Sequence, residues 1–202
     1  MAGTFSRLKE QEKDLRRNII IDAAEKEFAA KPFNKVNMRD IAKNAGISPA
    51  SIYRYFPDQQ SLFLEAFVRG TGDIFQKLAD MAAESKDGAL EEITSEFIDY
   101  FTSNDQYFSM LMHFFLDGMV EQDVFEKLRA LERNLLSVFD EVFTKMKMKG
   151  NIRFNSHTYF AGLVGIVATF RNRPDKELPD VLEHRQRISS ILAGHFRSSI
   201  DG

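Results

Sequence analysis

Hydrophobic positions recur at helical spacing along almost the whole of this 202-residue chain, and the alternation typical of strands is missing. In residues 14–30 an apolar stripe returns every three or four positions. Further helices are expected over residues 59–84, 89–103, 106–117, 122–149, 156–173 and 180–198. With two shorter helices between residues 37 and 56, the pattern predicts an all-α protein of about nine helices.

The two short helices are marked by their boundary residues. Asn37 and Ser48 are typical capping residues, and Pro49 suits the first position of a helix. Gly46 suits the left-handed position at which a helix ends, and Pro57 disfavours helix at the residue before it. Two helices joined by a tight glycine corner predict a helix-turn-helix.

The second of these helices, residues 49–55, has an unusual outward side. On a helical wheel Ile52 and Phe56 point inward. The outward side and its flanks hold small or hydrogen-bonding residues: Ala50, Ser51, Tyr53 and Arg54. Small residues allow close approach, and the others can donate to phosphates or base edges, so this helix is predicted to read DNA. A purely structural corner, with Tyr53 in the core, is the alternative.

Charge and composition agree with a nucleic-acid-binding head. Residues 1–58 carry 11 Lys and Arg against 8 Asp and Glu, whereas residues 59–202 carry 16 against 22. The absence of cysteine excludes disulfides and thiolate chemistry and suits a reducing compartment. The N-terminus does not resemble a secretory signal, and the longest apolar run, residues 159–170, is too short to span a bilayer. We therefore expect a cytoplasmic protein.

The segment "MRDIAKNAGISPASIYRYFPDQQSLFLEAF", preceded by "IIIDAAEKEFAAKPF", resembles the N-terminal domain of the TetR/AcrR family of bacterial transcriptional regulators over about residues 15–67. The resemblance implies a three-helix DNA-binding head in residues 1–57. It implies a C-terminal helical bundle in residues 58–202 that binds a small effector and forms a homodimer. The expected protein is a ligand-responsive repressor that binds a palindromic operator in double-stranded DNA and is associated with the bacterial nucleoid.

The resemblance also implies individual DNA contacts. The family pattern assigns base or phosphate contacts to Arg39, Pro49, Ala50, Ser51, Tyr53, Arg54 and Tyr55. Lys43 is added from its charge alone. Gln59 stands where many members have a phosphate-binding lysine, which weakens one contact. Pro49-Ala50 replaces a common Lys-Gly pair, so a thymine methyl is a reasonable partner there.

An effector site is predicted from aromatic and methionine side chains of the C-terminal half. Those that could line an apolar cavity, and adapt to varied ligands, are Phe97, Phe101, Met110, His113, Phe114 and Phe160. Ordinary hydrophobic core is an equal alternative, and for His113 a satisfied buried histidine is the favoured interpretation. The histidines lack metal-ligand spacing, so neither a metal nor a cofactor is expected. The apolar side chains favour an apolar or amphipathic effector.

A dimer interface is predicted on the last two helices. Small residues allow close helix approach, and with apolar positions of the last helix they would form a two-fold four-helix interface: Gly162, Gly165, Ala168, Val181, Ile188, Ile191 and Leu192. Packing within one chain is the alternative.

Gly70 and Gly72, inside the helix over residues 59–84, are a candidate hinge. An enzyme is not expected, because no nucleophile–base pair, carboxylate pair or phosphate loop stands out. A protein-binding adaptor without an effector is the remaining rival.

Overall fold

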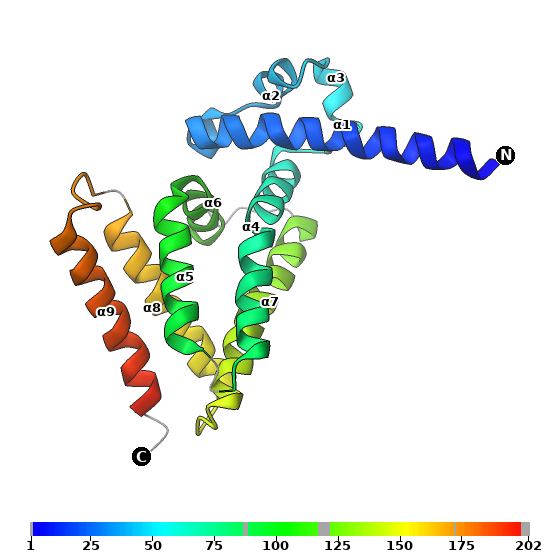
Figure 1. Cartoon of the computed structure of the whole chain (residues 1–202). Coiled ribbons are helices and arrows are strands. Elements are labelled where there is room, and N and C mark those ends of the chain that lie inside the picture. The colour runs from blue at the N-terminus through cyan, green and yellow to red at the C-terminus, as the bar shows by residue number, and fades with distance from the viewer. Residues whose placement is uncertain (1, 87–88, 117–121, 172, 199–202) are drawn as a thin grey trace. The chain divides into compact units, whose positions relative to one another are not determined.

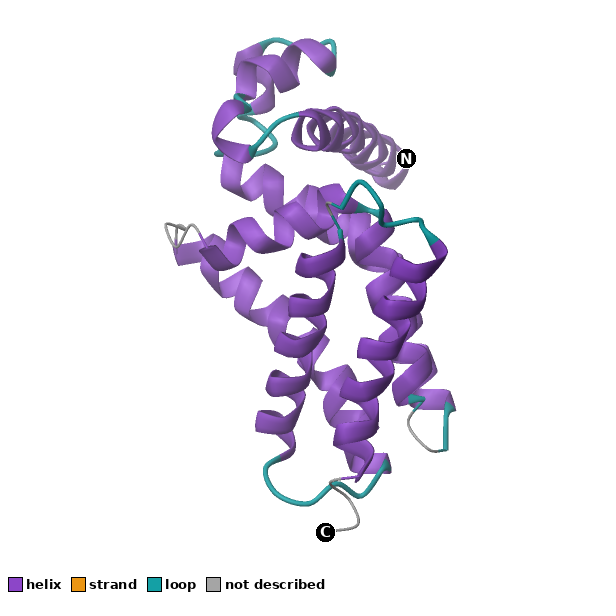
Figure 2. Ribbon diagram, turned by 90° about the vertical axis from the view of Figure 1, so that its left-hand side faces the viewer, coloured by secondary structure: helices purple, strands orange, loops and turns teal. Residues whose placement is uncertain are grey.

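The computed structural model describes residues 2–86, 89–116, 122–171 and 173–198. All regular structure in these ranges is helical, and Figure 2 shows no strand among them. The helices described there are α1 (Ala2–Ala30), the 3₁₀ turn η1 (Phe33–Lys35), α2 (Met38–Asn44), α3 (Pro49–Ile52), α4 (Gln59–Glu84), α5 (Leu90–Ser103), α6 (Asp105–Leu116), α7 (Gln122–Lys145), α8 (Ile152–Phe170) and α9 (Pro179–Ser198). The predicted all-α fold of about nine helices is confirmed. Asp117 and Asn172, inside two predicted helices, lie outside the described residues.

The chain divides into two compact units. The first comprises Met1–Gly70 and Ser109–Glu126, and the second comprises Thr71–Phe108 and Lys127–Gly202. The divisions fall inside α4, α6 and α7. The first unit therefore contains, beyond residues 1–57, the start of α4, the second half of α6 and the first residues of α7.

In the first unit, α1 runs alongside α2 and α3, and its N-terminal part continues past α3 (Figure 1). Of its predicted apolar stripe, Ile20 and Ala24 are almost completely buried, whereas Leu15 and Ile19 are exposed. The helix begins at Ala2 instead of residue 14 as expected. Residues 7–17 are mostly strong helix formers, and Glu12 pairs with Arg16 one turn later at 2.6 Å, which favours this earlier start.

An aromatic cluster holds the first unit together. The Phe33 and His113 rings lie 4.1 Å apart between centroids, and Phe63 packs edge-on against Phe28 at 4.7 Å and against Phe114 at 5.0 Å. Edge-to-face aromatic pairs stabilise a core beyond their buried area. The cluster therefore joins η1, α1, α4 and the second half of α6.

Ion pairs fix α1 against the first part of α4. Arg17 pairs with Glu65 at 2.9 Å, and its guanidinium lies 4.9 Å from the centre of the Phe56 ring. Arg69 pairs with Asp22 at 2.6 Å. These contacts hold the two helices in one register, which gives α2 and α3 a rigid support.

In the second unit, α5, α8 and α9 lie side by side (Figure 1). Tyr159 of α8 is fully buried, and its hydroxyl is hydrogen-bonded to Thr94 of α5. Burial raises the pKa of Tyr159, so its hydroxyl stays protonated. Its ring contacts Phe143 of α7 and Phe196 of α9. The side chain of Tyr159 is thus a centre around which four helices pack.

Candidate nucleic-acid interface and effector region

The helix-turn-helix predicted from the sequence is present, with the expected boundary geometry. Asn37 accepts a hydrogen bond from the Asp40 amide at 2.9 Å at the start of α2. Gly46 has a φ of 67° at the corner, and Ser48 accepts from the Ser51 amide at 3.2 Å at the start of α3. At the start of each helix a backbone amide is thus hydrogen-bonded to the capping side chain. The corner uses the left-handed conformation that glycine adopts without strain.

The reading helix is shorter than predicted. Regular helix ends at Ile52, not Tyr55, and the chain continues through a right-handed turn. There the amides of Arg54 and Tyr55 bond to the carbonyls three residues earlier, which is the tighter 3₁₀ pattern common at helix ends. Ile52 and Phe56 are buried as anchors, as expected.

The predicted DNA-contacting residues lie mostly on the surface. Tyr53 is 53% exposed, so a place in the core is wrong for this side chain. Exposed with it are Arg39, Lys43, Pro49, Ala50 and Arg54, whereas Ser51, Tyr55 and Gln59 are half-buried. The Gln59 amide donates to the Phe33 carbonyl at 2.9 Å, so it is occupied within the unit.

Positive charge on this surface is not neutralised internally. Within the described part of the chain, Arg39, Lys43 and Arg54 form no ion pair. A cation that has no carboxylate partner is available to a phosphate oxygen. The surface therefore combines small side chains, a phenol and free cations around one short helix.

The six predicted effector residues fall into the two different units. Met110, His113 and Phe114 belong to the first unit, where His113 and Phe114 are part of the aromatic cluster. Phe97, Phe101 and Phe160 belong to the second unit. There the Phe97 ring lies 4.7 Å from Phe101 and 6.0 Å from Phe160, all buried.

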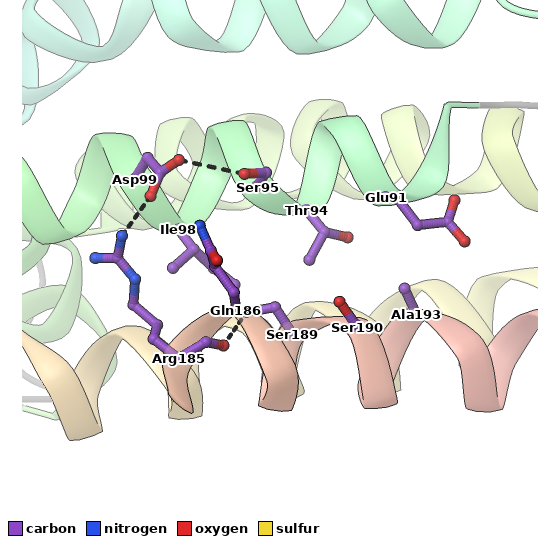
Figure 3. Close-up of a pocket in the computed structure, with 10 residues that line it drawn as sticks. All are labelled: Glu91, Thr94, Ser95, Ile98, Asp99, Arg185, Gln186, Ser189, Ser190 and Ala193. Carbon is purple, nitrogen blue, oxygen red and sulfur yellow. Dashed lines mark hydrogen bonds and ion pairs between the residues drawn. The ribbon is translucent and has the colours of Figure 1, made fainter. Parts of the chain in front are cut away.

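A polar cavity of about 250 Å³ lies between α5 and α9 (Figure 3). None of the predicted effector residues lines it. Most of the lining residues carry hydroxyl, amide or charged groups: Glu91, Thr94, Ser95, Ile98, Asp99, Arg185, Gln186, Ser189, Ser190 and Ala193. Figure 3 shows Asp99 bridging Ser95 and Arg185, with the ion pair at 2.7 Å. Glu91 pairs with Arg197, and these hydrogen bonds lower the pKa of Glu91. Sequence periodicity could not reveal this α5–α9 cavity, since it arises from long-range packing of two helices.

The predicted dimerisation residues divide into packed and exposed positions. A side chain at Gly162 would lie 3.0 Å from the Leu192 methyl groups, so this pair packs within one chain. Val181 and Ile188 are half-buried, and Gly165, Ala168 and Ile191 are exposed, Ile191 by 63%. The outer faces of α8 and α9 thus leave small and apolar side chains at the surface.

Two further features concern metals and membranes. Among the described residues, no three His, Asp or Glu side chains come together as a metal site would require. In the same ranges no helix is both long and apolar enough to cross a bilayer.

A capped α2, a glycine corner and an exposed α3 on an all-helical chain define the helix-turn-helix class of DNA-binding proteins. Residues 20–66 match the family described as bacterial regulatory proteins, tetR family. The match lies within residues 15–67, for which the sequence showed a resemblance to this family, and it confirms that resemblance.

Curated relatives of similar sequence are named HTH-type transcriptional regulators. An uncharacterized HTH-type transcriptional regulator of Haemophilus influenzae is 30% identical over 105 residues, which is 50% of this chain and 51% of that protein. The matched region thus covers about half the length of the curated relatives.

Two solved regulators share the fold. FadR of Bacillus subtilis, in complex with stearoyl-CoA, superposes with a TM-score of 0.67 at 17% identity, covering 87% of this chain and 96% of its own. A transcriptional regulator of Saccharomonospora viridis, in complex with choline, gives 0.68 at 14% identity, covering 89% and 95%. At these identities the likeness extends to the fold alone.

Proposed function

We propose that the protein is a transcriptional repressor that binds a palindromic operator as a homodimer and is released by a small effector. The observation that carries the DNA-binding part is the outward surface of α3. Its inner residues Ile52 and Phe56 are buried, while Ala50 and Arg54 are exposed and Arg54 has no ion pair in the described chain. A helix with this division serves a partner outside the unit, and a phosphate-rich duplex fits its chemistry.

Individual roles follow from the side chains. Arg54 is suited to two parallel hydrogen bonds with a guanine edge, and Ala50 with Pro49 to contact with a thymine methyl. The helix is positioned by side chains that donate hydrogen bonds to phosphate oxygens: Arg39, Lys43, Ser51, Tyr53 and Tyr55. The Gln59 amide already donates to a carbonyl, so we assign it at most a weak contact.

The homodimer is proposed to form through the outer faces of α8 and α9. Exposed small and apolar side chains there can pack against a second copy across a two-fold axis. Two copies of α3 would then enter successive major grooves about 34–36 Å apart, on a palindromic site. This arrangement requires the protein to work at the chromosome, in the cytoplasm and at the nucleoid.

The effector site is proposed for the second unit, around Phe97, Phe101 and Phe160. These rings are buried and adjacent, and an apolar or amphipathic compound would complement them. Stearoyl-CoA and choline, bound by two proteins of the same fold, are chemically unlike, so fold does not select the effector. The grouping of Met110, His113 and Phe114 with the reading head suits transmission of the effector signal better than contact with it.

The test is specific DNA binding. Duplexes selected by the protein from a random pool should share a palindrome. The affinity should fall steeply as the salt concentration rises, because Lys and Arg side chains of the protein displace counterions from the phosphates. Arg54→Ala should lose about 1–3 kcal/mol of discrimination between selected and scrambled duplex. Arg133→Ala is the matched control, since Arg133 is exposed in the second unit and forms no ion pair in the described residues. Failure to enrich any sequence, or equal losses in the two variants, would reject the proposal.

A further inference from the structure

The N-terminal half of α1 and the end of α3 enclose an open hollow of about 630 Å³ within the first unit. Every residue that lines it carries a polar or charged group: Ser6, Lys9, Glu10, Glu12, Lys13, Arg16, Arg54 and Tyr55. The α1 side of this α1–α3 hollow precedes residues 20–66, the segment that matches the tetR family. In Figure 1 that part of α1 is the dark-blue end that continues past α3.

Three of the four cations of the hollow lack an ion-pair partner among the described residues. Within the described chain, Lys9, Lys13 and Arg54 form no ion pair, and Arg16 pairs only with Glu12 at 2.6 Å. Lys9 and Lys13 are one helical turn apart, where like charges destabilise a helix. An anionic partner in the hollow would remove this repulsion.

The hollow also shares Arg54 with the proposed reading surface. Arg54 and Tyr55 stand on its α3 side, so an anion bound there would lie directly beside DNA held by α3. Residues 2–19 of α1 extend about 27 Å at 1.5 Å per residue. That length corresponds to about eight base pairs at 3.4 Å each.

We infer that the α1–α3 hollow binds the sugar-phosphate backbone of the operator next to the base pairs read by α3. This inference rests on the proposed function and adds a second contact region to it. Lys9, Lys13 and Arg16 supply charge, and the Ser6 and Tyr55 hydroxyls can donate to phosphate oxygens. An open, polar and mainly cationic hollow suits a continuous backbone better than an enclosed small molecule. Glu10 opposes the bound phosphate and limits the affinity.

The experiment compares paired charge-removing variants on one duplex selected by the wild-type protein. Lys9→Gln with Lys13→Gln should weaken binding roughly tenfold or more and reduce the slope of log K against log salt by about 3.6, because the proposed homodimer loses four lysine contacts. Glutamine keeps the helix propensity of lysine, so circular dichroism should be unchanged. Glu10→Gln should bind severalfold more tightly.

The matched control is Lys127→Gln with Lys149→Gln. Both lysines are exposed in the second unit, and the net charge changes by the same amount. Wild-type affinity and slope in this control, together with the loss in the first pair, support a local contact.

Three results would overturn the inference. A Lys9/Lys13 variant that keeps the wild-type salt slope, while Arg54→Ala still loses discrimination, rejects the second contact and leaves the proposed function intact. Equal losses in both lysine pairs indicate a general charge effect and also reject it. A wild-type protein that selects no duplex rejects the proposed function and this inference together.

Discussion

Three capping side chains determine where the helices of the reading head begin. Asn37, Ser48 and Asp58 each accept a hydrogen bond from a backbone amide three residues later, at 2.9, 3.2 and 2.6 Å respectively. The cap matters most at α3, because Pro49–Ile52 is only four residues long and has few internal hydrogen bonds. Ser48 thus stabilises the conformation that presents the outward surface.

We expect Ser48→Ala to reduce the free energy of unfolding by about 1 kcal/mol, within a range of about 0.5–2. Ser48→Asp should retain most of the stability, because aspartate caps as well as serine. Ser51→Ala is a control that removes the hydroxyl bonded to Ser48 but keeps the capped amide. Urea denaturation followed by circular dichroism measures all three, and equal stability of Ser48→Ala and wild type would contradict the role of the cap.

Caps and the glycine corner could be predicted from the sequence because each depends on residues within four positions. The end of α3 could not. Arg54 and Tyr55 are held in 3₁₀ geometry, and the choice between this and α-helix depends on how Phe56 is anchored in the unit. Exposure of Tyr53 likewise depends on tertiary packing and not on its position on the wheel.

At the level of elements, α4 is continuous from Gln59 to Glu84 despite the two glycines near its middle. A Cβ added at Gly72 would have no neighbour within 4 Å, so sterics do not require glycine there. Gly46 also has open space, but its φ of 67° disfavours any side chain. The backbone conformation therefore favours glycine at position 46, whereas neither sterics nor a left-handed conformation requires it at position 72.

We expect Gly72→Ala to raise the free energy of unfolding by up to about 1 kcal/mol, because alanine favours helix and restricts the unfolded chain. Gly46→Ala should lower it by about 1–2 kcal/mol through its left-handed backbone. Thermal unfolding of both variants against wild type checks the contrast. A loss of stability in Gly72→Ala would contradict the open space at this position.

Helical periodicity predicted α6 but not its surroundings. The segment is apolar almost all round, a pattern typical of a helix buried on every side. Instead Phe115 and Leu116 are 47% and 74% exposed, and His113 packs beside Phe33. The pattern of apolar positions indicates that a helix has partners, whereas the identity of those partners depends on contacts between residues far apart in sequence.

For the whole molecule, the outer faces of α8 and α9 are where self-association is expected. Phe154 and Ile191 are 70% and 63% exposed, and Gly165 and Ala168 of α8 are exposed as well. Large apolar side chains that are exposed on one surface are typical of a site that binds another protein subunit. Leu192, in contrast, already packs on Gly162 of its own chain.

We expect Ile191→Glu to shift the protein from dimer to monomer, because the interface would bury an unpaired carboxylate. Sedimentation equilibrium measures the change, and affinity for a two-half-site duplex should fall in parallel. Leu15→Glu is a matched control, since Leu15 is 62% exposed in the first unit. If Ile191→Glu remains dimeric while Leu15→Glu dissociates, the association surface lies elsewhere.

The DNA-binding residues and the effector residues differ in how far the sequence could predict their grouping. The DNA-binding residues come from one contiguous segment of sequence, so their grouping follows from local structure. The effector residues were drawn from three separate helices, and their division between the two units depends on long-range packing that no local signal carries. The α5–α9 cavity was missed for the same reason.

The aromatic cluster has a consequence for how such regulators can be recombined. Residues 109–116 contribute His113 and Phe114 to the packing around Phe33 and Phe63, although 50 positions of chain separate His113 from Phe63. A fragment cut after Gly70 would leave those rings open to water and prone to aggregate. A chimera that grafts this head onto a foreign bundle must therefore carry the matching stretch of α6, and in descendants of this sequence positions 33 and 113 should change together.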